Sequence, residues 1–235
     1  MDTSSNIGSA HERLISGLAD DLTPVRRLRP PSVRALAWLA VVVAGAVALT
    51  LIADLPALGR RLIAAPDMWL AVTGSALTAI LAAFAAFQLS LPDAHRAWAA
   101  LPLPAALLWI VASGVGCLRA WFVPETHAAD LSEARDCLIF IVGLSVPLSA
   151  LLIMMLRRAC PLQPGLTAAI AGLAAAAAAA TLLNFFHPFD AAATDLVVHV
   201  FAVALVIVAN RAFSGRLLAT NFLRSDVTRA LDRSN

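Results

Sequence analysis

Charge is scarce in this sequence. Only 14% of the 235 residues are charged, whereas 60% are hydrophobic, and an ordinary soluble domain carries roughly 25% charged residues. All 17 basic residues are arginine, and 15 acidic residues nearly balance them. The deficit of charge excludes an ordinary water-soluble domain, and the near balance of signs argues against nucleic acid as a partner.

Sequence motifs of enzymes are also missing. The chain has no nucleophile elbow, no Walker loop and no Rossmann glycine fingerprint. His11 and Glu12 begin like a zinc-protease motif, but Ile15 stands where the second histidine belongs. The polar first 33 residues lack the basic start, apolar core and cleavage site of a signal peptide. We therefore expect a non-enzymatic protein without a resident cofactor and without a removable leader.

Long apolar runs dominate what is present. Five of them have 18 or more residues and a sixth is slightly shorter, and about 20 apolar residues cross the hydrocarbon core as a helix. The short alternating stretches of a β-barrel do not occur. The sequence predicts an all-α polytopic membrane protein, a bundle of six transmembrane helices with short loops. The predicted helices are Leu36–Ala53, Met68–Leu91, Trp98–Leu118, Cys137–Leu156, Leu166–Phe186 and Leu196–Phe213.

Arginines in the loops predict the orientation of these helices, because basic residues of short loops are retained on the cytoplasmic side. With the amino terminus inside, 13 arginines lie inside and four lie outside. The four outside are Arg60, Arg61, Arg119 and Arg135. We expect residues 1–33 to form a cytoplasmic amino-terminal segment, 34–213 the membrane domain and 214–235 a cytoplasmic tail.

Residue types within the helices refine this picture. No charged residue lies in the central part of a predicted helix, which argues against an ion-coupled pump. The run Ala174–Ala180 predicts that the fifth helix lies inside the bundle, since small residues let helix backbones approach closely. Four tryptophans at predicted helix ends indicate the headgroup region, which an indole prefers. They are Trp38, Trp69, Trp98 and Trp121.

Cysteine and histidine side chains gather on the expected outer side. They are Cys117, His127, Cys137, His187 and His199. In an oxidising compartment the two cysteines could form a disulfide, combine with histidines to bind a soft metal ion transiently, or be oxidised to a sulfenic acid. Alternatively, the cysteines are small apolar helix residues and the histidines form local hydrogen bonds. The candidate sensing residues are Cys117, Cys137, His187 and His199, whereas Cys160 on the inner side is expected to be incidental.

Apolar residues of the amino-terminal segment recur at helical spacing. They are Ile7, Leu14, Ile15, Leu18 and Leu22. This pattern predicts a short amphipathic helix from Ile7 to Leu22, ending before Thr23 and Pro24. Such a helix could lie on the bilayer, pack on the bundle or bind a soluble partner. Its near-neutral charge favours the binding of a protein partner, because membrane-surface helices usually have a basic polar face.

Four segments of the chain resemble the NrsF family, the negative regulators of sigma F. They are LADDLTPVRRLRPPSVRALAWLA from Leu18, GCLRAW from Gly116, CLIFIVGLSVPLSALLIMMLRRACPLQPGLTAAIAGLAAAA from Cys137 and FHPFDAAATDLVVHVFAV from Phe186. The similarity runs over essentially the whole chain, with matching order and loop lengths. The combination of the four segments is much more specific than any one alone.

The resemblance implies a bacterial anti-sigma factor of the inner membrane, with both termini cytoplasmic. Such a protein holds an extracytoplasmic-function sigma factor at the membrane and frees it under oxidative or heavy-metal stress. The resemblance further implies sensing through periplasmic cysteines, of which Cys137 matches the one that opens the fourth helix. Some members carry a second cysteine after the fifth helix, where this chain has His187-Pro188. Cys117 or His187 would then take its part.

Two other classes of function compete with a regulator. A small-molecule or metal-ion transporter could use the outer cysteines and histidines as an uptake site, but the missing intramembrane charge argues against it. A membrane redox enzyme could hold haem between histidines of different helices, yet only His199 lies clearly within a predicted helix. The sequence leaves the oligomeric state open.

Overall fold

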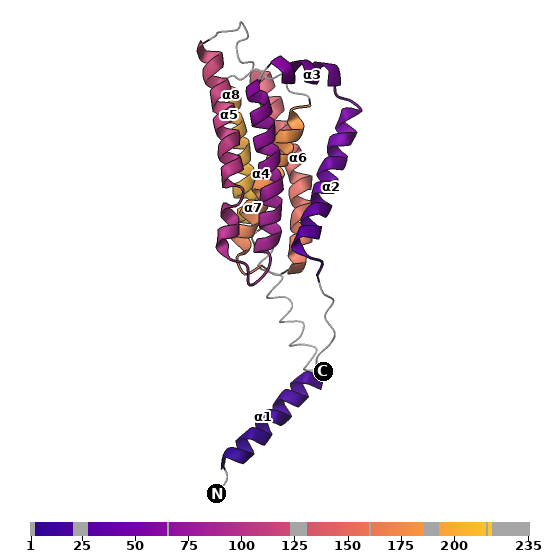
Figure 1. Ribbon diagram of the computed structural model, residues 1–235, viewed down its shortest axis with the longest axis vertical. Helices are drawn as coiled ribbons and strands as arrows, with labels where there is room; N and C mark the ends of the chain where they lie inside the picture. The colour runs from indigo at the N-terminus through magenta and orange to yellow at the C-terminus, as the bar shows by residue number, and fades with distance from the viewer. Residues whose placement is uncertain are drawn as a thin grey trace.

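The computed structural model describes residues 3–20, 28–64, 66–122, 131–159, 161–185, 193–214 and 216–217. The regular elements within these ranges are all helical, which confirms the all-α part of the predicted fold class (Figure 1). The α-helices are α1 (Thr3–Asp20), α2 (Pro31–Thr50), α3 (Leu55–Ala64), α4 (Pro66–Leu89), α5 (Leu103–Phe122), α6 (Leu131–Leu156), α7 (Pro164–Leu183) and α8 (Ala193–Ala209). Two 3₁₀ segments, η1 (Arg96–Ala100) and η2 (Arg157–Ala159), and a π-helical segment, η3 (Asn210–Ser214), complete the described helices.

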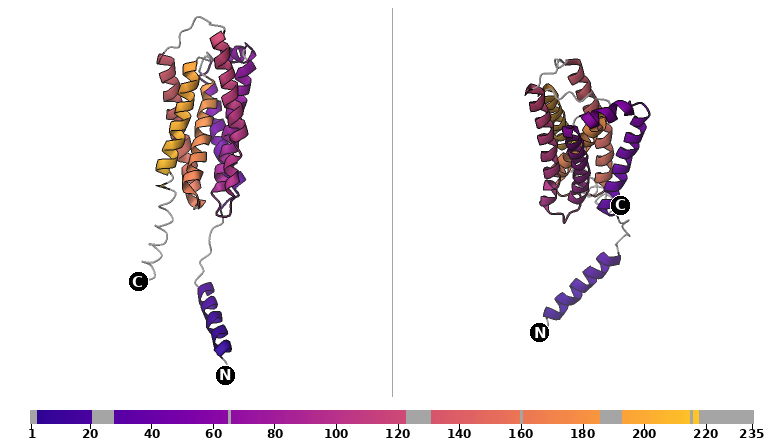
Figure 2. Two further views of the ribbon diagram at one scale, coloured as in Figure 1. Left: turned by 90° about the vertical axis from the view of Figure 1, so that its left-hand side faces the viewer. Right: turned by 45° about the horizontal axis from the view of Figure 1, so that its top comes forward.

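Five helical segments of the described chain are long and apolar enough to cross a membrane. They fall on α2, α4, η1 with α5, α6 and α7. The sixth predicted span corresponds to the apolar segment Val197–Phe213, which is shorter than the other five. It nevertheless belongs to the same bundle, because α8 packs against α6 and α7. Figure 2 shows α8, in yellow, beside α7, in orange.

The centre of the bundle is α7, which packs against α4, α6 and α8. Every residue of Ala174–Ala180 is buried, so the prediction that this helix lies inside the bundle is confirmed. In a membrane, helices associate through close packing and not through the exclusion of water. The small side chains of α7 allow such packing on several sides at once.

Glycines mark the closest approaches between helices. A Cβ added to Gly74 on α4 would lie 2.8 Å from Cα and N of Trp109 on α5. A Cβ added to Gly172 on α7 would lie 3.0 Å from Cβ of Asn210 and 3.1 Å from Cα of Ile207. The missing side chains therefore set the distance of α4 from α5 and of α7 from the end of α8.

The structure differs from the predicted boundaries at two places. The expected connection 54–67 contains α3, whose first turn is capped where the N–H of Ala57 donates to Oδ1 of Asp54 over 3.0 Å. In addition, α6 begins at Leu131, so Cys137 lies in its second turn and not at its start. Hydropathy ends a predicted span at the first charged residues, whereas helical hydrogen bonds continue past them.

Contacts between helices identify the two ends of the bundle. Arg34, at the start of α2, contacts Met155, near the end of α6, and this end is named the Arg34 end. Cys137 precedes Met155 by 18 residues in α6, so it lies about 27 Å further along the helix axis at 1.5 Å per residue. The opposite end is named the Cys137 end. Helix α1 extends away from the bundle beyond the Arg34 end, and α3 crosses the Cys137 end (Figure 1).

Candidate functional site

The thiol of Cys137 is buried between helices. Only 1% of this residue is exposed, and its sulfur is a free thiol. Ile141 on the same helix, Ala179 and Leu183 on α7 and Ala202 on α8 form a small apolar cluster around it. A buried cysteine in such a cluster packs like a small apolar residue, but it also has a polar neighbour.

That neighbour is His199 on α8. The Sγ atom of Cys137 lies 3.6 Å from both Nδ1 and Nε2 of the imidazole ring. The donor and acceptor roles in this contact depend on the tautomer of the ring, because a protonated ring nitrogen is a donor and an unprotonated one is an acceptor. The two residues come from segments 62 positions apart, and together they form one polar contact across the α6–α8 seam.

A soft metal ion would require a particular geometry of this pair. Zinc binds thiolate sulfur at about 2.3 Å and imidazole nitrogen at about 2.0 Å with tetrahedral angles, which places the two ligand atoms about 3.6 Å apart. A sulfur equally far from both ring nitrogens lies off the lone-pair direction of either one, so the imidazole of His199 would have to rotate before it and Cys137 could bind the same metal ion. Among the residues described, no group of three or more His, Cys, Asp or Glu side chains could hold a metal ion.

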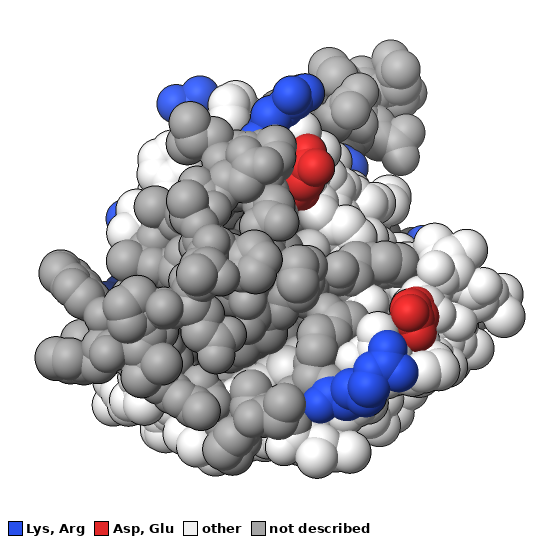
Figure 3. Space-filling view, turned by 90° about the horizontal axis from the view of Figure 1, so that it is seen from above, with Lys and Arg blue, Asp and Glu red and all other residues white. Residues whose placement is uncertain are grey.

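The other predicted sensing residues cannot be added to this pair. Cys117 lies on α5, but its side chain is outside the described part of the structure. His187, His127 and Cys160 also lie outside the described residues. Pairing of Cys117 with Cys137 and ligation by His187 therefore stay predictions. Figure 3 looks down on the Cys137 end and shows acidic side chains close to basic ones near its edge.

The predicted partner-binding face lies on α1. The side chains of Leu14, Ile15 and Leu18 are exposed by 62%, 61% and 57%. A helix that packed its apolar face against the bundle would bury these side chains. Ile7 lies in α1 without a described side chain, and Leu22 lies outside the described residues. The helix spans Thr3–Asp20, close to the predicted Ile7–Leu22. Its apolar face is therefore presented away from the bundle.

A polar contact at the Arg34 end escaped the sequence analysis. The guanidinium of Arg34 donates to Oγ of Ser90, at 3.5 Å, and to the main-chain oxygen of Met155. Its carbon Cζ lies 4.9 Å from the ring centroid of Phe87, a cation–π distance. Arg34 is the first residue of the predicted membrane domain, and it is only 7% exposed.

The interpretation of Trp38 as a headgroup anchor was wrong. Trp38 is fully buried, and its indole N–H donates to the main-chain oxygen of Leu148 on α6 over 3.1 Å. Trp69 and Trp98, by contrast, are exposed by 54% and 39%. Arg34 and Trp38 are four residues apart, which places them on one face of α2. That spacing was the signal available in the sequence. The contacts of the two side chains attach the beginning of α2 to α4 and α6.

The fold and these contacts define a class of protein. The chain is a multi-pass α-helical membrane protein with an appended amphipathic helix. A family model described as NrsF, negative regulator of sigma F, matches residues 18–220, and the chain belongs to this family. It is thus a non-enzymatic regulator whose family description names sigma F as the partner. No curated protein and no solved structure matches the chain.

Proposed function

We propose that this protein is an anti-sigma factor of the bacterial inner membrane that sequesters an extracytoplasmic-function sigma factor through α1. A periplasmic oxidant or heavy metal, sensed at Cys137 and His199, releases that factor. The observation that carries the proposal is the separation of two features: the exposed apolar face of α1 lies beyond the Arg34 end, and the Cys137–His199 contact lies toward the other. Such a chain can connect chemistry on one side of a membrane to binding on the other.

The proposed orientation rests on the arginines that flank the helices. The exposed side chains of Arg29, Arg96, Arg157, Arg158 and Arg211 belong to segments at the Arg34 end. Arg60 and Arg135 belong to the Cys137 end. The excess of basic residues supports a cytoplasmic Arg34 end, since these groups are retained on that side. The short helix Val197–Phe213 acts as the sixth span in this proposal, so both termini are cytoplasmic.

Helix α1 has the properties of a segment that binds a protein. Its apolar residues Leu14, Ile15 and Leu18 share one side and are exposed, as expected for a helix that enters an apolar groove of a partner. Its charges nearly cancel, with Glu12 beside Arg13, so attraction to anionic lipid is weak. Burial of the apolar face against the sigma factor would stabilise the complex through the hydrophobic effect.

Co-purification of the sigma factor with the full-length protein tests this role. The double substitution Leu14→Glu and Leu18→Glu places charge on the apolar face and should abolish recovery of the sigma factor. Ser16→Glu is the control for added charge, because Ser16 is exposed on the same helix and receives the same charge as each of the two substituted leucines. Equal recovery with the double variant and the wild type would refute a role of α1.

Sensing at Cys137 would act on the packing of α6 and α8. Because Cys137 is only 1% exposed, a metal ion or an oxidant reaches the sulfur only when the two helices move apart. A metal ion that replaces the thiol proton then occupies space that the closed packing does not have. The same holds for the oxygen of a sulfenic acid, which forms when hydrogen peroxide oxidises the thiol and water is released. The altered packing is the step that would release α1 from its partner.

Stress induction of the regulon tests the sensing role. Cys137→Ser nearly keeps the size of the side chain but removes the thiol, so the response to cadmium or to peroxide should be lost. Cys160→Ser is the control, because this cysteine belongs to the proposed cytoplasmic side, and its response should equal that of the wild type. An unchanged response of the Cys137 variant would exclude that thiol from the sensing mechanism. It would not contradict the proposed binding of the sigma factor through α1.

A further inference from the structure

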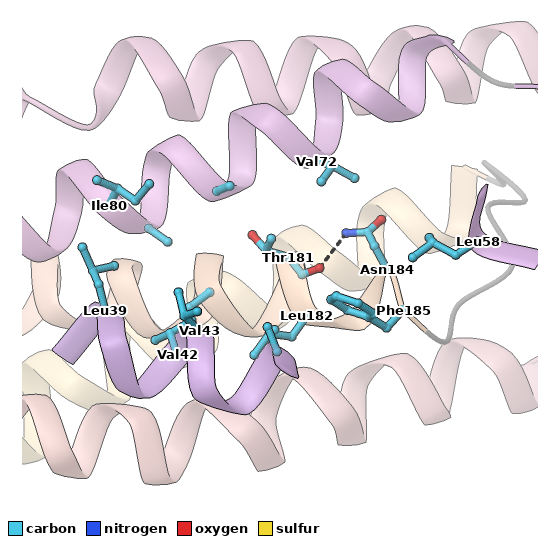
Figure 4. Close-up of a pocket in the computed structure, with 14 residues that line it drawn as sticks. Leu39, Val42, Val43, Leu58, Val72, Ile80, Thr181, Leu182, Asn184 and Phe185 are labelled. Atoms are coloured by element: carbon cyan, nitrogen blue, oxygen red, sulfur yellow. Dashed lines mark hydrogen bonds between the residues drawn. The ribbon is translucent and has the colours of Figure 1, made fainter. Parts of the chain in front are cut away.

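A cavity of about 400 Å³ lies between α2, α4 and α7 (Figure 4). Its wall on α2 is formed by Leu39, Val42 and Val43, and Leu58 of α3 also lines it. Small-molecule sites typically measure roughly 300–1,000 Å³. The cavity is therefore large enough for a ligand of that size.

The cavity exists because α2 is fastened to the bundle at one end only. Arg34 and Trp38 bind the beginning of α2 to α4 and α6, and beyond them the helix leans away from α4 (Figure 1). Alanines 76, 79 and 178 face this gap from α4 and α7, and their small side chains do not fill it. The α2 end nearer to α3 consequently stands apart from the helices that it faces.

Water is poorly suited to this cavity. Its polar lining residues are Thr181 and Asn184, and both already have hydrogen-bond partners. The Oγ1 atom of Thr181 lies 2.9 Å from Oγ of Ser75 and 2.8 Å from the oxygen of Ala177, and the amide of Asn184 donates to the oxygen of Ala180 over 3.0 Å. A buried water needs two to four polar partners, and apolar cavities instead accept apolar molecules.

The opening of the cavity meets the hydrocarbon of the bilayer. Val43 and Ile80 line it and are exposed by 60% and 38%, so it reaches the outer surface of the bundle between α2 and α4. Both helices belong to the apolar segments that can cross a membrane. The molecule in contact with this opening is therefore a lipid. Helix α1 lies beyond the opposite end of the bundle and does not reach it.

We propose that the cavity between α2, α4 and α7 binds one acyl chain of a membrane phospholipid. The adjoining helix α3 closes one part of the site, because Leu58 lines the cavity. The proposal depends on insertion of α2 and α4 in the membrane and not on sigma factor binding or on the chemistry of Cys137.

Native mass spectrometry of the detergent-purified protein tests the site. The wild type should retain one phospholipid per chain. Ala46→Trp and Ala76→Trp each place an indole in the cavity and should eliminate the retained lipid. Ala44→Trp is the matched control, since Ala44 is exposed on α2 and does not line the cavity; it should retain the lipid. Retention by all three variants, or retention of a free fatty acid without phospholipid, would overturn the assignment.

Photo-cross-linking in the wild type gives an answer even where a tryptophan variant does not fold. A phospholipid with a photoreactive group near the end of its acyl chain is reconstituted with the protein in vesicles. Label should concentrate on the residues around Val43, Val72 and Ile80. Label spread evenly over the exposed side chains of α5 and α8, at the same density as on α2 and α4, would show only general lipid contact and exclude a bound chain.

Discussion

The indole N–H of Trp38 on α2 donates to the main-chain oxygen of Leu148 on α6, over 3.1 Å and across 110 positions of sequence. Both groups are buried. Leu148 directly follows Pro147, which lies inside α6 without ending it. This bond and the contacts of Arg34 determine the position of α2, the first membrane helix. Because α2 joins α1 to the bundle, they also determine where the segment containing α1 is attached.

Loss of the indole donor should weaken this attachment. Trp38→Phe keeps an aromatic ring but removes the N–H, and we expect a loss of about 1 kcal/mol in the free energy of unfolding. Unfolding in mixed micelles with increasing denaturing detergent measures it. Trp69→Phe, at a residue that is 54% exposed, should leave stability within about 0.5 kcal/mol of the wild type. Equal effects of the two substitutions would contradict the role of the Trp38 bond.

Removal of the Arg34 guanidinium should loosen the start of α2. Arg34→Met retains a long side chain but loses the donors to Ser90 and Met155 and the contact with Phe87, at a cost of roughly 1–3 kcal/mol for the buried acceptors. Amide hydrogen exchange at residues 34–40 should become faster. Arg29→Met is the control, because it removes the same positive charge from an exposed position. It therefore distinguishes the loss of buried contacts from the loss of a charge that orients the helices. Unchanged exchange in the Arg34 variant would disprove the attachment.

The contact of α4 with α5 should not tolerate a methyl group at Gly74. In Gly74→Ala the new Cβ would lie 2.8 Å from main-chain atoms of Trp109, so the helices must separate, with a loss of roughly 1–3 kcal/mol. Thermal unfolding in detergent measures the change. Gly114→Ala on α5 meets no atom within 4 Å and should be neutral or stabilising. A neutral Gly74 variant would mean that the two helices are not in such close contact.

Two serines one turn apart on α6 should respond differently to substitution by alanine. The Oγ of Ser149 accepts a hydrogen bond from the amide of Asn210 over 3.0 Å, so Ser149→Ala should cost about 1 kcal/mol. The Oγ of Ser145 is buried and has no hydrogen-bond partner among the described residues. Ser145→Ala should therefore leave stability unchanged or raise it in the same unfolding assay. Destabilisation by Ser145→Ala would reveal a partner of this hydroxyl.

Much of the fold follows from properties of single segments. Apolar length marked the membrane helices, and the alanine run marked α7 as the buried helix. The regular spacing of apolar residues marked α1. The same reasoning missed α3, because a ten-residue helix between charged residues has too little apolar length to stand out from a loop.

The sequence by itself determined the class of the protein, since the hydropathy of each stretch acts locally and the membrane demands helices whatever their neighbours are. Only the tertiary structure decided which side chains meet. The pairing of Cys137 with His199, the burial of Arg34 and Trp38, and the cavity beside α2 depend on how far each helix is rotated and tilted. Those angles come from contacts between distant residues, such as Gly172 with Asn210, and no single stretch of sequence contains them.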